Sequence, residues 1–198
     1  MNLDYIAGFF DGEGTATAVI CRRPDMCYGF AIQPMIEIAQ KYPDILNEIQ
    51  QFLGFGHVDV THVSLTQRTA RMPCGRWRTT ARDDCKRFIE LIAPRSRLKG
   101  KQLQLLLTVI ENGTRPRCGG MIPPIPKERL LRALDAVEQI HAINKGKRWA
   151  CDLNQLHQHV IAFDMEAWKQ RRFDVLRVAT EHIIEASTRH ALFSSRVV

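Results

Sequence analysis

Apolar and polar positions alternate with a period of two along the early part of the chain. Residues 28–40 alternate clearly and residues 15–23 more weakly, which predicts two strands that each have one buried face. The segment between them, residues 22–26, contains Pro24 and Asp25 and has the composition of a hairpin loop. We therefore expect an antiparallel hairpin whose second strand carries an inward apolar set: Phe30, Ile32, Pro34, Ile36 and Ile38.

Helical periods separate this hairpin from a second one and dominate the rest of the chain. Pro43 stands where the first turn of a helix tolerates proline, and Gly54 and Gly56 end the apolar pattern that follows. Residues 57–65 and 76–80 predict the second hairpin, with Trp77 facing inward. Further helices are predicted through residues 85–92, where Pro94 stops the pattern, and over 99–112, 127–144 and, more weakly, 153–168 and 173–192.

The composition is that of a globular protein with a basic surface. The 198 residues suffice for one core domain and an appendage, and 45% hydrophobic with 25% charged residues excludes a disordered chain. The net charge of +7 and the pI of about 9.3 favour polyanions such as nucleic acid. Because no apolar run is long enough for a membrane span, we expect no membrane partner and an intracellular location, in an organelle (chloroplast or mitochondrion) or in prokaryotic cytoplasm.

The six cysteines are scattered and form no Cys-x-x-Cys pair, so we expect reduced thiols rather than a zinc or redox centre. His157 and His159 follow Cys151 closely enough to suggest a metal cluster. Surface histidines on a polar helix are the simpler interpretation, and we adopt it.

One helical run near the start of the chain carries glycines that helix formation alone does not explain. Gly8 and Gly12 lie four residues apart, on one face of a segment that also contains Ile6, Phe9 and Phe10. Each glycine costs a helix about 1 kcal/mol relative to alanine. Because the two glycines leave a flat strip on which a second helix can lie close, the pattern predicts helix packing along this face.

The same run ends in two acidic residues. Asp11 and Glu13 flank Gly12, and Gly14 stands where a helix C-terminal glycine is common. Carboxylates at this end face the negative pole of the helix dipole, which is unfavourable unless a cation is bound nearby. The pattern therefore predicts a metal site at the end of this helix. A glycine-rich turn after a short buried helix is the alternative.

These residues resemble the nine-residue motif of the LAGLIDADG homing endonucleases, in the run Ile6-Ala7-Gly8-Phe9-Phe10-Asp11-Gly12-Glu13-Gly14. The predicted order of elements matches the α+β core of that family, αββαββα, whose antiparallel sheet forms a DNA-binding saddle. The resemblance covers residues 1–145. It implies an endonuclease core domain over 1–145 and a C-terminal helical extension of unknown role over 146–198.

The resemblance also implies site chemistry. It assigns divalent metal, Mg²⁺ or Mn²⁺, to Glu13, with Gly12 adding its backbone carbonyl. Two further catalytic roles fall on Gln40 and Lys99, which would organise water or phosphate around the metal. Where some relatives have an arginine four residues after that glutamine, this chain has Asp44, so we expect a differently built solvent network.

The chain carries one copy of the motif, and single-motif members of the family work as homodimers. The resemblance therefore implies a dimer in which the two Glu13 carboxylates lie close together across a two-fold axis. Such like charges repel each other unless cations lie between them. Two symmetric sites imply a double-strand cut, and the expected dimer interface contains Gly8, Phe9, Asp11 and Gly12.

Strand parity predicts a polar face on the two hairpins that is suited to DNA. Its mixture of basic, acidic, amide and apolar side chains matches base edges in the major groove, whereas pure phosphate binding would show more lysine. The solvated face of any two-faced antiparallel sheet alternates in the same way, and that alternative stays open. The predicted face comprises Thr15, Thr17, Val19, Cys21, Arg23, Gln33, Met35, Glu37, His57, Asp59, Thr61, Arg76, Arg78 and Thr80, with Arg95, Arg97 and Lys101 as DNA phosphate contacts.

Three functional hypotheses follow. The first is a homodimeric, Mg²⁺-dependent, site-specific double-strand DNA endonuclease with a long, partly palindromic target. The second is an RNA maturase that binds its host intron RNA, or a nuclease-inactive DNA-binding protein on the same fold. The third is an unrelated protein whose basic surface binds another polyanion, and it predicts a monomer.

Overall fold

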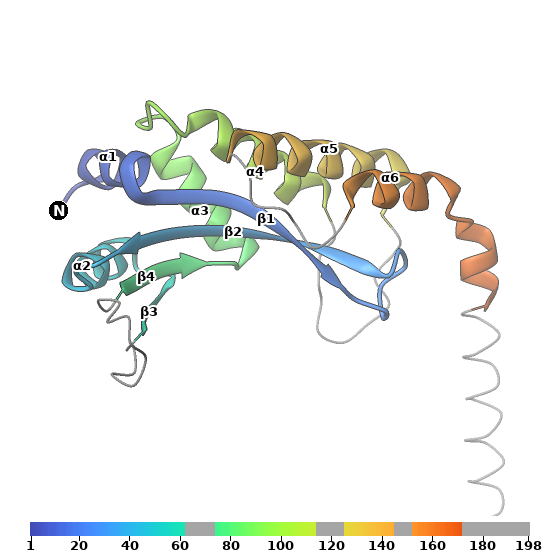
Figure 1. Cartoon of the computed structure of the whole chain (residues 1–198), viewed down its shortest axis with the longest axis horizontal. Coiled ribbons are helices and arrows are strands. Elements are labelled where there is room, and N and C mark those ends of the chain that lie inside the picture. Colours follow the sequence, from blue (N-terminus) through green and yellow to red (C-terminus); the bar gives the residue numbers. More distant parts are fainter. Residues whose placement is uncertain (62–73, 114–124, 145–151, 172–198) are drawn as a thin grey trace, which may run out of the picture. The chain divides into compact units, whose positions relative to one another are not determined.

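A computed structural model describes residues 1–61, 74–113, 125–144 and 152–171 of the chain (Figure 1). The first seven elements follow the predicted order of helix, two strands, helix, two strands and helix, which confirms the α+β core. Further helices come after it. The elements are α1 (Leu3–Glu13), β1 (Gly14–Arg22), β2 (Phe30–Gln40), α2 (Asp44–Leu53), β3 (His57–Thr61), β4 (Cys74–Thr79), α3 (Arg82–Ile92), α4 (Gly100–Asn112), α5 (Lys127–Ile143) and α6 (Leu153–Ala162).

The four strands form one antiparallel sheet in the order β1-β2-β4-β3, so the two hairpins join through β2 and β4. Gly14 of β1 lies opposite Ile38 of β2, and Ile38 lies in turn opposite Trp77 of β4. Helices α3, α4 and α5 lie on one side of the sheet, as Figure 1 shows. In the described part of the chain, the other side of β1 and β2 is left uncovered by helices.

The helices are held to the sheet by a core of apolar side chains. Ile6 and Phe10 of α1 are fully buried, and the Phe10 ring meets the edge of Phe88 in α3 at 5.1 Å between centroids. Phe88 also contacts Trp77 at 5.4 Å, so the predicted inward orientation of Trp77 is confirmed. Burying a large apolar side chain contributes about 1.5–3 kcal/mol. The inward set predicted for β2 is buried as well: Phe30, Ile32, Pro34, Ile36 and Ile38.

Helix α1 begins and ends for identifiable reasons. Asn2 caps its N-terminus, where the side-chain oxygen accepts a hydrogen bond from the backbone N–H of Tyr5 at 2.8 Å. At the other end, Gly14 has φ −81°, an extended backbone, and not the left-handed helix cap that the sequence suggested. A Cβ at Gly14 would overlap the ring of Phe10, so close packing explains this glycine. Gly54, with φ 75°, does end α2 in the expected left-handed conformation.

Side chains of α5 cover the outer edge of β1. Nε2 of His141 donates a hydrogen bond to the carbonyl of Ala18 (3.2 Å), and Nδ2 of Asn144 donates one to the carbonyl of Ala16 (3.0 Å). Gln102 of α4 in turn donates to Asn144 Oδ1 at 2.7 Å. Burial lowers the pKa of His141, although its bond to the Ala18 carbonyl opposes the shift. These bonds fix α5 along β1 and satisfy edge carbonyls that no other strand of the described residues reaches.

The chain forms two compact units, Met1–Ile161 and Ala162–Val198. The first unit includes α6, which lies beyond the core boundary at residue 145 that the resemblance implied. In the second unit, residues 165–171 are helical, and Oδ1 of Asp164 accepts hydrogen bonds from the backbone N–H groups of Glu166 and Ala167, both at 3.0 Å. The single helix predicted over residues 153–168 is therefore wrong, because Asp164 caps a new helix.

The other predicted boundaries hold with small shifts. Strand β2 begins at Phe30 because Gly29, with φ 76°, completes the hairpin turn and donates a hydrogen bond to the Met26 carbonyl at 2.9 Å. The predicted strand residues 62–65, the predicted helix 173–192 and Cys151 lie outside the described residues. Within the described parts, no helix has the length and apolar character needed to cross a membrane.

Candidate functional site

The glycine strip of α1 is open in the single chain. Gly8 and Gly12 are exposed, and a Cβ added to either would meet no neighbouring element within 4 Å in the part of the chain that the structure describes. Tyr5, which is 49% exposed, stacks on Phe9 beside the strip with ring centroids 6.0 Å apart. Because no packing among the described residues accounts for these glycines, the strip is a surface on which a second helix backbone can lie.

Glu13 is the last residue of α1 and is exposed, directly before β1 begins. The side chain of Lys99 reaches the same helix end, where its Nζ donates to the Phe10 carbonyl at 2.8 Å and to the Gly14 carbonyl. Burial lowers the pKa of Lys99, and the negative charges of Asp11 and Glu13 oppose the shift. The cation that the sequence required at this helix end is thus supplied in part by Lys99.

Asp11 lies two residues before Glu13 but is used within its own chain. Its carboxylate accepts hydrogen bonds from Ser96 Oγ at 2.5 Å and from the backbone N–H groups of Arg97 at 2.7 Å, Leu98 at 3.2 Å and Lys99 at 3.2 Å. Burial on its own would raise the pKa of Asp11, but these hydrogen bonds lower it below its ordinary value. The carboxylate thus binds the segment before α4 within the chain. The place of Asp11 in a dimer interface remains a prediction.

Gln40 ends β2 at the same end of the sheet as Glu13, because Gly14 lies opposite Ile38 in the register. The side chain is half-buried, and its Oε1 accepts a hydrogen bond from the backbone N–H of Lys41 at 2.6 Å. Asp44 stands in the first turn of α2, where an acidic residue is favourable for the helix dipole. The catalytic roles of Gln40 and Lys99 remain predictions.

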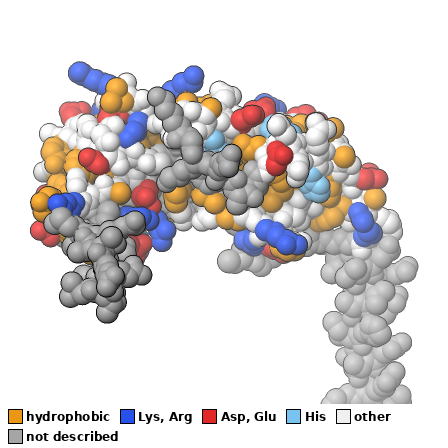
Figure 2. All heavy atoms as spheres, viewed as in Figure 1, with side chains coloured by type: hydrophobic (Ala, Val, Ile, Leu, Met, Phe, Trp, Pro, Cys, Tyr) orange, Lys and Arg blue, Asp and Glu red, His pale blue; other side chains and the backbone are white. Residues whose placement is uncertain are grey.

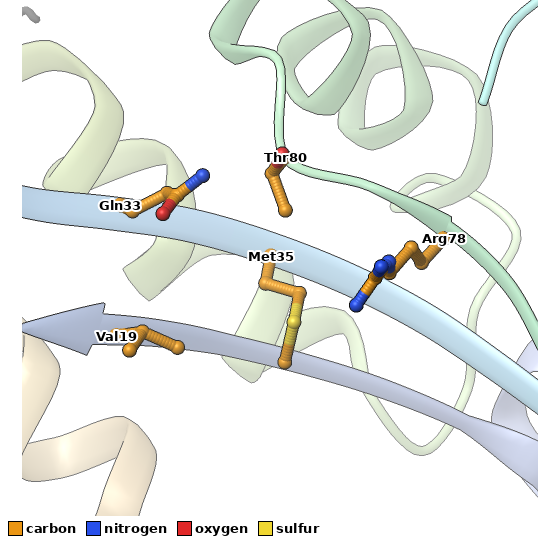
Figure 3. Close-up of a pocket in the computed structure, with 5 residues that line it drawn as sticks. All are labelled: Val19, Gln33, Met35, Arg78 and Thr80. Atoms are coloured by element: carbon orange, nitrogen blue, oxygen red, sulfur yellow. The ribbon is translucent and has the colours of Figure 1, made fainter. Parts of the chain in front are cut away.

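The sheet face opposite the helices brings together side chains predicted on different strands. Val19 of β1, Gln33 and Met35 of β2, Arg78 of β4 and Thr80 just after it line a hollow of about 300 Å³ (Figure 3). Apolar side chains and hydrogen-bonding groups therefore share one concave patch.

Several other residues of the predicted DNA face are partly buried or already bonded within the chain. Thr17 is 4% exposed and lies opposite Met35, so as placed it offers little surface to a ligand. Thr15 is exposed and Glu37 half-buried. The Cys21 thiol donates a hydrogen bond to Gln33 Oε1 at 3.7 Å. Arg23 is ion-paired with Asp25 at 2.8 Å in the hairpin loop.

The second hairpin carries a cross-strand charge cluster. The carboxylate of Asp59 lies 2.9 Å from His57 Nε2 and 3.2 Å from Arg78 Nη2. Arg76 lies opposite Asp59 in the pairing of β3 with β4, whereas Trp77 between the two arginines is fully buried. Thr61 ends β3, and the residues after it lie outside the described parts.

The predicted phosphate contacts divide into two kinds. The guanidinium of Arg95 lies 3.3 Å from Asp4 and also donates to the Leu91 carbonyl at 2.8 Å, so it joins α1 to α3. Arg97 and Lys101 are exposed. Figure 2 shows Lys and Arg side chains in separate groups among acidic and apolar ones on the visible face. The net positive charge is therefore distributed there rather than gathered in one patch.

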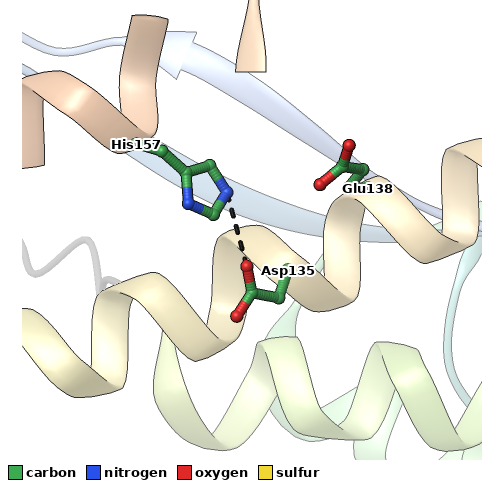
Figure 4. Close-up of side chains that lie close together, drawn as sticks. All are labelled: Asp135, Glu138 and His157. Atoms are coloured by element: carbon green, nitrogen blue, oxygen red, sulfur yellow. Dashed lines mark ion pairs between the residues drawn. The ribbon is translucent and has the colours of Figure 1, made fainter. Parts of the chain in front are cut away.

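A second polar cluster joins α5 to α6. Ligand atoms of Asp135, Glu138 and His157 lie within 4.8 Å of one another, and His157 Nε2 is 3.6 Å from Asp135 Oδ1 (Figure 4). His157 was predicted to be a surface histidine, because no local spacing reveals a partner on another helix. Lys127 also donates to the Ile161 carbonyl at 2.9 Å, so these contacts fix α6 to the first unit.

Comparison with known proteins agrees with this architecture. Residues 6–107, more than half of the chain, match the LAGLIDADG endonuclease family. The chain belongs to that family. No curated protein sequence matches the chain.

Solved structures of similar fold include homing endonucleases. The homing endonuclease I-CvuI, in complex with its target in the presence of Ca, is 18% identical with a TM-score of 0.62, over 81% of this chain and 93% of that one. The archaeal intron-encoded I-Vdi141I, complexed with DNA, is 16% identical with a TM-score of 0.63, over 85% and 96%. The group I intron-encoded I-CeuI, complexed with DNA, is 11% identical with a TM-score of 0.60, over 80% and 75%. At these identities the likeness concerns the fold.

Proposed function

We propose that this protein is a site-specific double-strand DNA endonuclease that acts as a homodimer with Mg²⁺ or Mn²⁺. The observation that carries the proposal is the exposed Glu13 carboxylate at the end of a helix whose Gly8 and Gly12 surface is open. Family membership and the DNA-bound relatives of the same fold support DNA as the substrate.

The groups that this chain offers fit a hard divalent cation. Glu13 presents an exposed carboxylate, Gly12 has a backbone carbonyl one residue before it, and oxygen is the ligand that Mg²⁺ prefers. In a two-fold dimer, the second Glu13 would add an equal carboxylate across the axis. The chemistry that the bound ion supplies is charge neutralisation at the phosphate and activation of a water.

The remaining steps belong to the side chains of this chain. The ammonium of Lys99, held at the end of α1, would place positive charge beside the scissile phosphate and favour its more negative transition state. Gln40, at the same end of the sheet, would orient water through its amide. Two sites related by symmetry would cut one strand each.

The sheet face would select the target. Arg78 has the donor geometry for guanine and Gln33 for adenine, whereas Val19 and Met35 suit the methyl group of thymine. Arg97 and Lys101, which are exposed, would contact phosphates and position the duplex without reading its sequence.

The test begins with a plasmid library that carries a randomised insert and includes the intron-less host site. We expect wild-type protein to linearise a selected subset in Mg²⁺, and Glu13→Gln to bind the selected duplex without cutting it. Glu48→Gln, an exposed change on α2, is the matched control and should cleave normally. Lack of cleavage by wild type, or undiminished cleavage by Glu13→Gln, would reject the proposal.

Two further measurements on the same protein distinguish the endonuclease from the maturase and from an unrelated polyanion-binding protein. Filter binding of host intron RNA, with no cleavage of DNA, would favour the maturase hypothesis. Sedimentation velocity should give a dimer, and a monomer at all concentrations would favour an unrelated polyanion-binding protein.

A further inference from the structure

The C-terminal turn of α1 and the segment before α4 hold each other through two opposite sets of hydrogen bonds. The Asp11 carboxylate of α1 accepts from Ser96 Oγ and from three consecutive backbone N–H groups, those of Arg97, Leu98 and Lys99. In the other direction, Lys99 Nζ donates to the carbonyls of Phe10 and Gly14. We call these residues the α1–α4 clasp.

Each half of the clasp supplies partners to backbone groups near the ends of α1 and α4. The N–H groups of Arg97, Leu98 and Lys99 lie in the segment directly before α4, and an ionised carboxylate is a strong acceptor for them. The carbonyls at the end of α1 likewise receive an ammonium. Ser96 strengthens the arrangement, because its Oγ donates to Asp11 and also accepts from the Lys99 N–H at 3.1 Å.

The position of Lys99 depends on this segment. Lys99 is the residue directly before α4, and its backbone N–H is itself one of the donors to Asp11. Its Nζ lies 5.4 Å from the centre of the Phe10 ring. If the segment moved away from Asp11, the base of the lysine side chain would move with it.

We infer that Asp11 is a positioning residue, which holds the 96–99 segment so that the ammonium of Lys99 stays at the end of α1 beside Glu13. Asp11 touches neither substrate nor the reacting atoms in this arrangement. It acts through Lys99, and the inference rests on the proposed function for its catalytic consequence.

A double-mutant cycle separates positioning from a merely structural role. On a duplex selected from the randomised library, Asp11→Asn should lower kcat by about 10–100-fold, because one acceptor becomes a donor that faces N–H groups. Dimerisation and the Kd for the duplex should be unchanged. In a Lys99→Met background, the same change should cost less than about twofold more. An equal loss of kcat in both backgrounds would overturn the inference.

A second readout does not depend on catalysis. In protein labelled with ¹³C at lysine Cε, the Lys99 signal, assigned by its loss in Lys99→Met, should move toward that of exposed lysines in Asp11→Asn. If Asp11→Asn does not fold, Ser96→Ala removes one hydrogen bond to the same carboxylate and should shift the signal part of the way. A Lys99 signal identical to wild type in the folded variants would overturn the inference.

These two arms distinguish failure of the inference from failure of the proposed function. If wild type cleaves no DNA, the proposed function fails, while the lysine signal still shows whether Asp11 positions Lys99. Asp83→Asn, an exposed change in the first turn of α3, is the matched control and should alter neither kcat nor the Lys99 signal.

Discussion

The end of α1 and the sheet face below it are held in different ways. At the end of α1, hydrogen bonds join residues far apart in the chain: Asp11 and Ser96 are separated by 85 positions, and Phe10 and Lys99 by 89. On the sheet face, Asp59 pairs with His57 on its own strand and with Arg78 on the next. The first region is fixed by the whole fold, whereas side chains of the second can be exchanged with little effect on the backbone. Such a division suits an enzyme with constant chemistry and a variable target.

The largest effect should come from filling the open strip. A Cβ at Gly8 would meet no neighbouring element of the described residues within 4 Å, and leucine favours a helix by up to about 1 kcal/mol over glycine. The monomer should fold at least as well as wild type, while dimerisation and double-strand cleavage should be lost. Sedimentation velocity and plasmid cleavage measure both outcomes.

The control for Gly8→Leu is Glu90→Leu, which adds leucine to an exposed position of α3. It should leave the dimer intact. A Gly8→Leu protein that still sediments as a dimer would show that copies of the chain meet elsewhere.

Gly14→Ala should destabilise the protein, since the added methyl group overlaps the Phe10 ring. Overpacking of this kind costs about 1–3 kcal/mol, which urea denaturation detects as a lower midpoint. Gly12→Ala adds the same methyl group to open space and should not lower the stability of the monomer. Equal stability of both variants would contradict the packing account of Gly14.

Arg78→Ala should change target preference while leaving the fold intact. Loss of a bidentate contact removes about 1–3 kcal/mol of discrimination at one base pair. Selection from randomised duplexes should therefore show one relaxed position in each half-site. Arg132→Ala, on the exposed side of α5, is the matched control and should select the wild-type sequence. Relaxation at every position would instead indicate a phosphate contact.

The smallest effect concerns pH and His141. Burial lowers its folded-state pKa below the ordinary value of 6.5, so the unfolded chain binds the proton more readily. Stability from neutral His141 should be fully present above that value and decline as the pH falls below it. Urea denaturation at about pH 7.5 and about pH 5.5 should show the decline, and His141→Gln should reduce it. A decline of the same size in His141→Gln would assign the pH dependence to other groups.

Local patterns were sufficient for the order of the elements. Alternation in β1 and β2, the proline before α2 and the inward Trp77 each depend on neighbouring residues, and each agrees with the structure. The helix break at Asp164 was missed because the apolar pattern continues across it, although aspartate is a common N-cap residue.

The site was less predictable, because its contacts are non-local. Lys99 was found through the resemblance, but its bonds to carbonyls of α1 require the fold. Asp11 has the same charge and motif context as Glu13, so sequence alone could not show that one is enclosed by N–H groups and the other exposed. The burial of Thr17 was not predicted, since parity gives the direction of a side chain and not its depth.

The covered edge of β1 also limits how copies of this chain can assemble. An uncovered outer strand can template another strand, and repeated addition leads to polymers and aggregates. Here His141 and Asn144 occupy carbonyls that an incoming strand would need. Sheet-to-sheet growth at this border is thereby obstructed.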